Sequence, residues 1–244
     1  MPKHYRNLRG ATVLRTRYLL LTEKAIKDVM RFYGMGAIVG PAGLGKTFAV
    51  SHALESFVGD VVRVTFDTRA TPKLVADRLM VTLTGRRAGR TKYEIAEEML
   101  SVLAEKPRLI VIGEAQNLNR DCFETLRYLH DDEHTSFALL FDGGDGCWDV
   151  LNKERMLHSR IDRRVAFEPL PTAELPALLP SYHPIYQDVD PNLLLAIDKS
   201  LARGRLREWA KFTQTAAEIC AALAVTHINR EIAESAITEI GTGG

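Results

Sequence analysis

The sequence predicts an α/β fold with a five-stranded parallel sheet, followed by a small helical domain at the C-terminal end. The first observation is that short apolar runs alternate with segments of helical periodicity, which is typical of a parallel sheet covered by helices. The second is a change of character after Leu170, where strand-like runs end and helical patterns follow. The segment just beyond is punctuated by prolines, at Pro171, Pro176, Pro180, Pro184 and Pro191. At 244 residues the chain is long enough for one large domain, or for one domain with a small appendage.

The elements follow in order along the chain. Ahead of the sheet, Thr22 followed by Glu23 predicts an N-capped helix that runs to Phe32. Apolar runs then predict five strands, over Ala37–Val39, Val61–Phe66, Leu109–Ile112, Phe137–Phe141 and Val165–Phe167. Helical spacing predicts the helices between them, over Thr47–Phe57, Pro72–Leu83, Lys92–Leu103, Asp121–His130 and Trp148–His158. Further helices are expected after the proline-rich segment, over Asn192–Ala202, Leu206–Ala224 and Arg230–Ile240.

These patterns divide the chain into a basic N-terminal arm over 1–21, a core over 22–170 and a helical domain over 171–244. The formal net charge of the whole chain is only +1, so it indicates no partner by itself. The arm, however, carries several cations before the first acidic residue, at Lys3, Arg6, Arg9, Arg15 and Arg17. Such an arm either contacts nucleic acid or is simply solvated. The C-terminal domain either closes over a ligand as a lid or packs on the sheet as an extension.

The composition places the chain in a reducing compartment. Its three cysteines are widely separated, show no metal-binding spacing, and by their odd number argue against a disulfide framework. The N-terminus lacks the apolar core of a signal peptide, and no apolar run approaches the length of a membrane span. We therefore expect a cytoplasmic protein without a membrane partner.

The most specific motif is a complete phosphate-binding loop of the pattern G-x-x-x-x-G-K-T. Its residues are Gly40, Pro41, Ala42, Gly43, Leu44, Gly45, Lys46 and Thr47. A predicted strand before it and a predicted helix after it provide the context that the motif requires. Glycines let backbone N–H groups turn inward around an anion, and the helix N-terminus adds its positive dipole. We expect Lys46 to neutralise the β- and γ-phosphates of ATP and the Thr47 hydroxyl to bind Mg²⁺.

A second candidate site follows the predicted strand Leu109–Ile112. Glu114 stands where a water-activating carboxylate is expected, at the end of a buried strand. The position before it is Gly113, so the carboxylate that orients Mg²⁺ in such sites is missing. Asp142 follows a strand expected to neighbour the Glu114 strand, and we hypothesise that it partly replaces the missing charge at the metal. The alternative is an exposed Asp in a glycine-rich turn.

With these motifs in place, about residues 20–240 resemble an AAA+ ATPase, a P-loop fold with a five-stranded parallel sheet and a small helical lid. The closest resemblance is to the DNA-transposition subgroup of phage Mu protein B, TnsC and TniB. The segment Leu109–Leu129 is similar to their D-E-A-Q box and the helix after it. The segment Leu157–Leu170 resembles their arginine-finger helix and last strand, and Gly204–Arg207 resembles the lid signature G-x-L-R.

The resemblance implies roles for two arginines. Arg160 would reach into a neighbouring subunit's site and stabilise developing phosphate charge, so that Glu114, Arg160 and Lys46 are the catalytic candidates. The alternative for Arg160 is a contact with the C-terminal end of its own helix. Arg207 would contact the triphosphate from the lid, and its alternative is a solvated charge beside Glu208.

The chain also departs from the family pattern at two catalytic positions. Gly113 breaks the Asp-Glu pair, and Gly143-Gly144 stands where relatives carry a glycine followed by a polar residue. Both departures predict slow hydrolysis, with ATP binding itself acting as the switch.

In relatives that polymerise on DNA, the contacts come from the stretch after the second strand and from the following loop. The candidate residues here are Arg69, Lys73, Arg86, Arg87, Arg90 and Lys92. Glycines among them allow close approach to phosphates, and the cations release counterions on binding. No aromatic residues are interleaved, so we expect sequence-independent binding to double-stranded DNA. The alternative is a charged loop that is only solvated.

Together, these features predict an ATP-dependent regulator of transposition that forms a homo-oligomeric ring or filament. It would mark target DNA and recruit or activate a transposase. Two alternatives stay open: a signalling or secretion-linked NTPase switch that does not bind DNA, and a replication or helicase-loader ATPase.

Overall fold

A computed structural model describes residues 8–87, 89 and 91–242 and divides the chain into two compact units. The sheet unit comprises residues 17–42 and 49–167. The helical unit comprises the described residues of 1–16, 43–48 and 168–244, so that most of the phosphate-binding loop is grouped with it.

The sheet unit contains a five-stranded sheet in the order β2-β3-β4-β1-β5, and every neighbouring pair is parallel. The strands are β1 Met35–Val39, β2 Asp60–Thr65, β3 Arg108–Gly113, β4 Phe137–Gly143 and β5 Ile161–Ala166. This confirms the predicted sheet. Every strand extends beyond its predicted bounds at one end or both, most of all β4, which includes Asp142 and Gly143, and β5, which already begins at Ile161.

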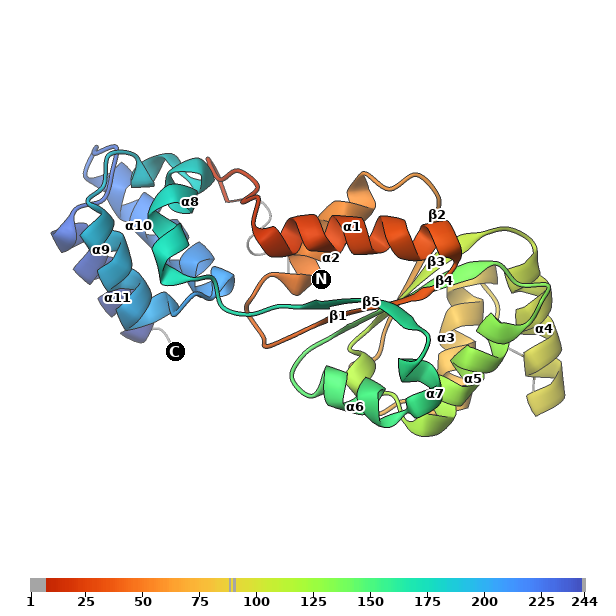
Figure 1. Cartoon of the computed structure of the whole chain (residues 1–244). Coiled ribbons are helices and arrows are strands. Elements are labelled where there is room, and N and C mark those ends of the chain that lie inside the picture. Colours follow the sequence, from red (N-terminus) through yellow and green to blue (C-terminus); the bar gives the residue numbers. More distant parts are fainter. Residues whose placement is uncertain (1–7, 88, 90, 243–244) are drawn as a thin grey trace. The chain divides into compact units, whose positions relative to one another are not determined.

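Helices cover both faces of the sheet (Figure 1). They are α1 Arg17–Phe32, α2 Lys46–Glu55, α3 Pro72–Thr84, α4 Lys92–Ala104, α5 Arg120–Asp131, α6 Cys147–Lys153 and α7 Arg155–His158. Alternate strand residues such as Ile112 and Phe141 join one buried cluster with Leu79 of α3 and Phe123 of α5. On the opposite face, Gly36 leaves room for α1, because a Cβ there would lie 2.9 Å from a methyl group of Val29.

The prediction that Thr22 caps a helix is wrong. The helix α1 begins earlier, at Arg17, and Thr22 is fully buried inside it. Its hydroxyl donates a hydrogen bond to the carbonyl of Tyr18 at 2.8 Å, which satisfies the side chain within the helix. The predicted helix Trp148–His158 is also wrong as one element, because Glu154 leaves helical geometry and separates α6 from α7.

The helical unit is built from short helices around an apolar core. They are α8 Leu175–Tyr182, α9 Pro191–Ile197, a π-helical turn Asp198–Ala202, α10 Leu206–Ala222 and α11 Arg230–Thr242, with 3₁₀ turns at Thr172–Glu174 and Pro184–Tyr186. Trp209, Phe212 and Tyr186 are buried at its centre with their rings edge to face. The α8 helix was not predicted, because prolines mark its sequence. Pro176 nevertheless fits its first turn, where the missing N–H has no partner to lose.

None of the described helices combines the length and the apolar character that a membrane crossing requires.

Candidate nucleotide-binding site

The phosphate-binding loop leaves the end of β1 and leads directly into α2. Gly40, Gly43 and Gly45 adopt φ values of 138°, 86° and 92°, a region that favours glycine. At Gly40 an added Cβ would lie 2.4 Å from the carbonyl oxygen of Phe167, so the close approach of the two backbones also requires glycine. The α2 helix begins at Lys46, which is 8% exposed. The loop therefore has the backbone that a phosphate-binding nest needs, as the motif predicts.

The other loop residues divide between exposed and buried positions. Pro41, Ala42 and Thr47 are exposed, whereas Leu44 is buried at 3%. An exposed Thr47 hydroxyl in the first turn of α2 fits the predicted contact with Mg²⁺. Among the described residues, no group of three or more His, Cys, Asp or Glu side chains could hold a metal ion by itself.

Within the helical unit, the start of α10 lies against Gly43. The backbone N–H of Arg207 donates to the carbonyl of Gly43 at 2.9 Å. A Cβ on Gly43 would lie 3.5 Å from the Cβ of Arg207 and 3.9 Å from the Cβ of Arg205, and both arginine side chains are exposed. Glu208 pairs with Lys211 at 3.1 Å. Arg207 therefore lies beside the phosphate-binding loop, its contact with a triphosphate stays a prediction, and Arg205 is a neighbour that sequence reasoning missed.

Glu114 occupies a strained position at the carboxyl end of β3. Its φ and ψ are 56° and 44°, a left-handed conformation that is uncommon for residues other than glycine. The side chain is exposed and accepts a hydrogen bond from the amide of Gln116. The other end of that amide accepts from the backbone N–H of Gly144 at 3.1 Å. Gln116 thus ties Glu114 to the end of β4, a role that its place in the E-A-Q box did not reveal.

Gly113 lies in a crowded row that crosses three strands. Thr65 of β2 and Asp142 of β4 are its register partners. A Cβ on Gly113 would lie 2.7 Å from the hydroxyl oxygen of Thr65. At the place of the absent carboxylate, the Thr65 side chain would therefore have to shift to admit any side chain at position 113.

Asp142 is buried within β4, so the alternative of an exposed turn residue is wrong. Its carboxylate pairs with the guanidinium of Arg63 at 3.3 Å. The same guanidinium donates to the hydroxyl of Ser51 on α2 at 2.9 Å. Arg63 comes from β2 and therefore reaches across β3 to this carboxylate. The charge of Asp142 is thus engaged by an arginine.

The end of β4 also lacks room for a side chain. A Cβ on Gly143 would lie 2.4 Å from the sulfur of Cys147 and 2.6 Å from the amide oxygen of Gln116. Gly144 is less confined, since its added Cβ would be 3.7 Å from Gln116. The polar group nearest to this position is accordingly the amide of Gln116.

Arg160 makes a two-point ion pair with Asp131 at the end of α5. Its Nε and one terminal nitrogen each donate to a carboxylate oxygen at 2.9 Å. The other terminal nitrogen donates to the carbonyl of Met156 in α7 at 2.8 Å, as the helix-end alternative predicts. Asp131 also pairs with Arg127 at 3.0 Å. Within one chain, the arginine-finger candidate is held by its own subunit.

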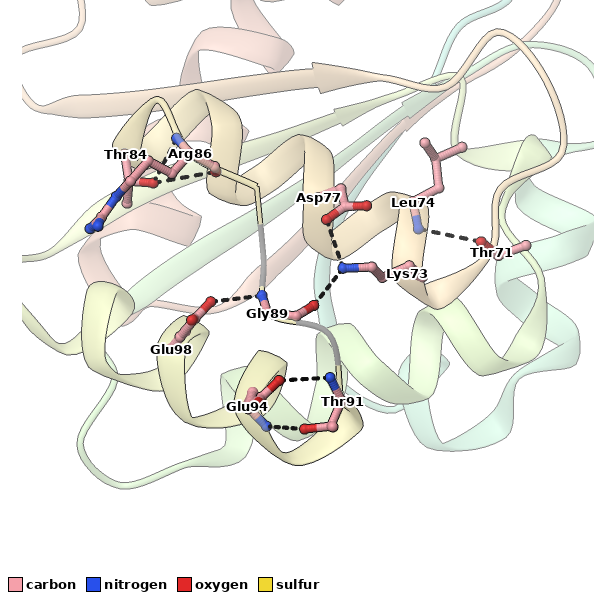
Figure 2. A network of polar contacts seen from close by, with 10 residues as sticks. All are labelled: Thr71, Lys73, Leu74, Asp77, Thr84, Arg86, Gly89, Thr91, Glu94 and Glu98. Atoms are coloured by element: carbon pink, nitrogen blue, oxygen red, sulfur yellow. Dashed lines mark hydrogen bonds and ion pairs between the residues drawn. The ribbon is translucent and has the colours of Figure 1, made fainter.

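The predicted DNA-contacting segment is ordered by contacts of its own (Figure 2). Lys73 pairs with Asp77 at 2.9 Å and donates to the carbonyl of Gly89 at 2.7 Å. The N–H of Gly89 donates to Glu98 at 2.9 Å. Lys73 therefore has two partners that hold the loop.

The remaining DNA candidates differ in how far the structure describes them. Arg69, Arg86 and Arg87 are exposed. Arg90, the side chain of Lys92, and Lys3 and Arg6 of the N-terminal arm lie outside the described residues.

Comparison with known proteins identifies the fold. Residues 31–151 match the family model described as an AAA domain. The chain is similar to Cdc6p from Pyrobaculum aerophilum, with a TM-score of 0.71 and 17% identity over 94% of this chain and 68% of that chain. It is similar to Aeropyrum pernix ORC1 in complex with DNA, with a TM-score of 0.66 and 20% identity over 96% of this chain and 67% of that chain. It is also similar to Aeropyrum pernix ORC2 in ADPNP-ADP complexes, with a TM-score of 0.65 and 16% identity over 96% of this chain and 71% of that chain. No curated protein sequence matches.

We predict that Gly113→Ala destabilises the protein by about 1–3 kcal/mol, because the new methyl group meets Thr65 in a packed row. In a Thr65→Ala background the added cost of Gly113→Ala should fall, since the conflicting hydroxyl and methyl groups are gone. Urea unfolding of the two single variants and the double variant measures this coupling. Gly144→Ala is the matched control and should change stability by less than about 0.5 kcal/mol. Strictly additive effects at 65 and 113 would contradict the packing argument.

We also predict that Arg63→Ala and Asp142→Ala each destabilise the protein by about 1–3 kcal/mol, because each removes one member of an ion pair whose side chains are only 20% and 7% exposed. The double variant should lose less than the sum of the two. Chemical unfolding of all four proteins gives the coupling energy, and Arg163→Ala with Asp28→Ala provides a matched exposed ion pair. That pair, at 2.7 Å, should show weak coupling. Equal coupling in both pairs would count against the importance of burial.

Proposed function

We propose that this chain, an ATPase whose residues 31–151 form an AAA domain within an AAA+ fold, works as an ATP-dependent DNA-binding switch. The observation that carries the proposal is the contrast between its two motifs. The phosphate-binding loop is complete, with glycine at every left-handed position that the backbone requires. The acidic motif has lost one carboxylate, and the Thr65 side chain crowds that place. Binding chemistry is thus better provided for than hydrolysis.

The proposed roles follow from the chemistry of each side chain. Lys46 and the loop N–H groups bind the β- and γ-phosphates of ATP, and Thr47 binds Mg²⁺. Mg²⁺ supplies a positive charge that the phosphate oxygens share. Glu114 orients and polarises water, and Arg207 contacts the triphosphate from the lid. A direct contribution of Asp142 to the metal is less favoured, because Arg63 already engages its carboxylate.

Assembly is the second part of the proposal. Arg160 serves the nucleotide site of a neighbouring copy once it leaves Asp131, which makes the active form a homo-oligomeric ring or filament. The exposed Arg69, Arg86 and Arg87 contact the phosphates of double-stranded DNA without reading its sequence. Lys73 supports these contacts by fixing the loop at Gly89.

The biological process we favour is transposition, with this chain marking target DNA for a transposase. Its support is the resemblance of the E-A-Q box, the arginine-finger segment and the lid signature to that subgroup. A second candidate is a replication or helicase-loader ATPase, favoured by the similarity in fold to Cdc6p and ORC proteins. A replicative partner in place of a transposase would select it. A signalling NTPase without DNA is the third, and absence of DNA binding would select that.

We expect rings or filaments on duplex DNA only when ATP is present, because occupancy of the phosphate-binding loop completes the surface that a neighbouring Arg160 contacts. Negative-stain electron microscopy with and without ATP measures this. Lys46→Ala should abolish ATP binding and assembly, while Lys27→Ala, which removes an exposed lysine of α1, should leave both intact. Monomers under every condition would overturn the proposal.

We expect the Arg86→Ala/Arg87→Ala variant to bind DNA more weakly and with a smaller salt dependence. Removing two phosphate contacts should reduce the slope of log K against log salt by about 1.8. Fluorescence anisotropy with a labelled duplex at several salt concentrations measures the slope. The control is Arg31→Ala/Arg230→Ala, which removes two exposed arginines elsewhere. An unchanged slope for the 86/87 variant would place the DNA contacts on other residues.

A further inference from the structure

A buried carboxylate organises the turn that carries Arg207. Asp198 is 2% exposed and begins the π-helical turn Asp198–Ala202. One of its oxygens accepts from the backbone N–H of Gly204 at 2.8 Å and from the indole N–H of Trp209 at 3.1 Å. The other accepts from the hydroxyl of Thr172 at 3.0 Å. Three separate segments of the helical unit therefore converge on one side chain.

The turn held by Asp198 has an unfavourable backbone. Arg203 and Gly204 are consecutive left-handed residues, with φ values of 49° and 71°. The N–H of Arg203 donates to the carbonyl of Asp198 at 2.7 Å, and the N–H of Leu170 donates to the carbonyl of Gly204 at 2.9 Å. A Cβ on Gly204 would lie 2.6 Å from the carbonyl oxygen of Leu170. Such a conformation persists only where its surroundings impose it, and Asp198 bonds to both of its residues, to Arg203 through the backbone carbonyl and to Gly204 through the carboxylate.

The turn sets where α10 begins and what lies at its first residues. Arg205 and Arg207 stand exposed at the N-terminal end of the helix, beside Gly43 of the same unit. Helix N-termini carry a partial positive charge, so two arginines there repel the helix and one another. A bound triphosphate removes that repulsion. The two arginines at the start of α10 are therefore more favourable when a nucleotide is bound than when the site is empty.

We propose that Asp198 is a positioning residue for nucleotide binding. It fixes the turn over residues 203–207 so that the N–H of Arg207 meets Gly43, and Arg205 and Arg207 together contact the phosphates. The proposal rests on the proposed function, since it assigns these arginines to ATP. It adds a second lid arginine, Arg205, and names the buried group on which both depend.

A graded set of variants tests the proposal through the Kd for ATP. Asp198→Asn keeps an acceptor for Gly204 and Trp209, so its Kd for ATP should stay within about twofold of wild type. Thr172→Val removes one hydrogen bond to Asp198 and should raise the Kd for ATP about threefold. Asp198→Ala should raise the Kd for ATP by about tenfold or more. In a Trp148→Phe background, Trp209 is the only tryptophan, and ATP should change its emission in the parent but not with Asp198→Ala.

The control separates positioning from stability. Tyr186→Phe removes the buried hydrogen bond to Thr213 at 2.6 Å in the same core, without touching the turn. It should lower the free energy of unfolding yet leave ATP affinity within about twofold. If Asp198→Ala fails to fold, the comparison of Thr172→Val with Tyr186→Phe decides. Equal ATP affinity in Asp198→Ala or Thr172→Val and wild type would overturn the inference. Failure of wild type itself to bind ATP would instead overturn the proposed function.

Discussion

The candidate site depends on the parallel register of the sheet at its carboxyl edge. Hydrogen bonding places Val39 of β1 beside Gly143 of β4, and Asp142 beside Gly113 of β3. The phosphate-binding loop, Glu114 and the turn after β4 consequently leave the sheet at one edge, where parallel α/β folds bind their ligands. A slip of one residue in any of these strands would turn its buried side chains to the opposite face.

The same register shows what surrounds Gly113, the position at which the family pattern has an aspartate. Gly113 lies between Thr65 and Asp142, and the Arg63 guanidinium reaches from β2 to the Asp142 carboxylate on β4. Ser51 completes this contact from α2. A buried ion pair thus joins β2, β4 and the helix after the phosphate-binding loop. The Asp142 carboxylate therefore stabilises the fold through this ion pair, although it lies at the edge of the sheet where we expected a carboxylate to bind a metal.

The sequence was sufficient to predict features set by local patterns, and insufficient for features set by pairing across the fold. Apolar runs and the glycine spacing predicted the sheet and the loop because both signals lie within a few residues. The prediction that Thr22 caps a helix was wrong, since its hydroxyl bonds to a carbonyl inside the helix. The Arg63–Asp142 pair joins residues 79 positions apart, and only the strand order brings them together. The sequence showed that Gln116 belongs to a segment similar to the D-E-A-Q box, but only the structure shows that its amide accepts a hydrogen bond from Gly144.

The two arginine candidates show how binding and assembly become coupled in the proposed switch. Arg207 already lies against Gly43 within its own unit, so it depends on no other copy. Arg160 is held by Asp131 through two hydrogen bonds, and it can serve a neighbouring site only by exchanging that carboxylate for another anion. A triphosphate in the neighbour supplies that anion, whereas an empty neighbour does not. Because a charge is exchanged for a charge, the desolvation cost is offset only when nucleotide is bound. In the switch that we propose, assembly would then report occupancy of the phosphate-binding loop, and hydrolysis would need only to be slow enough to let the assembly persist.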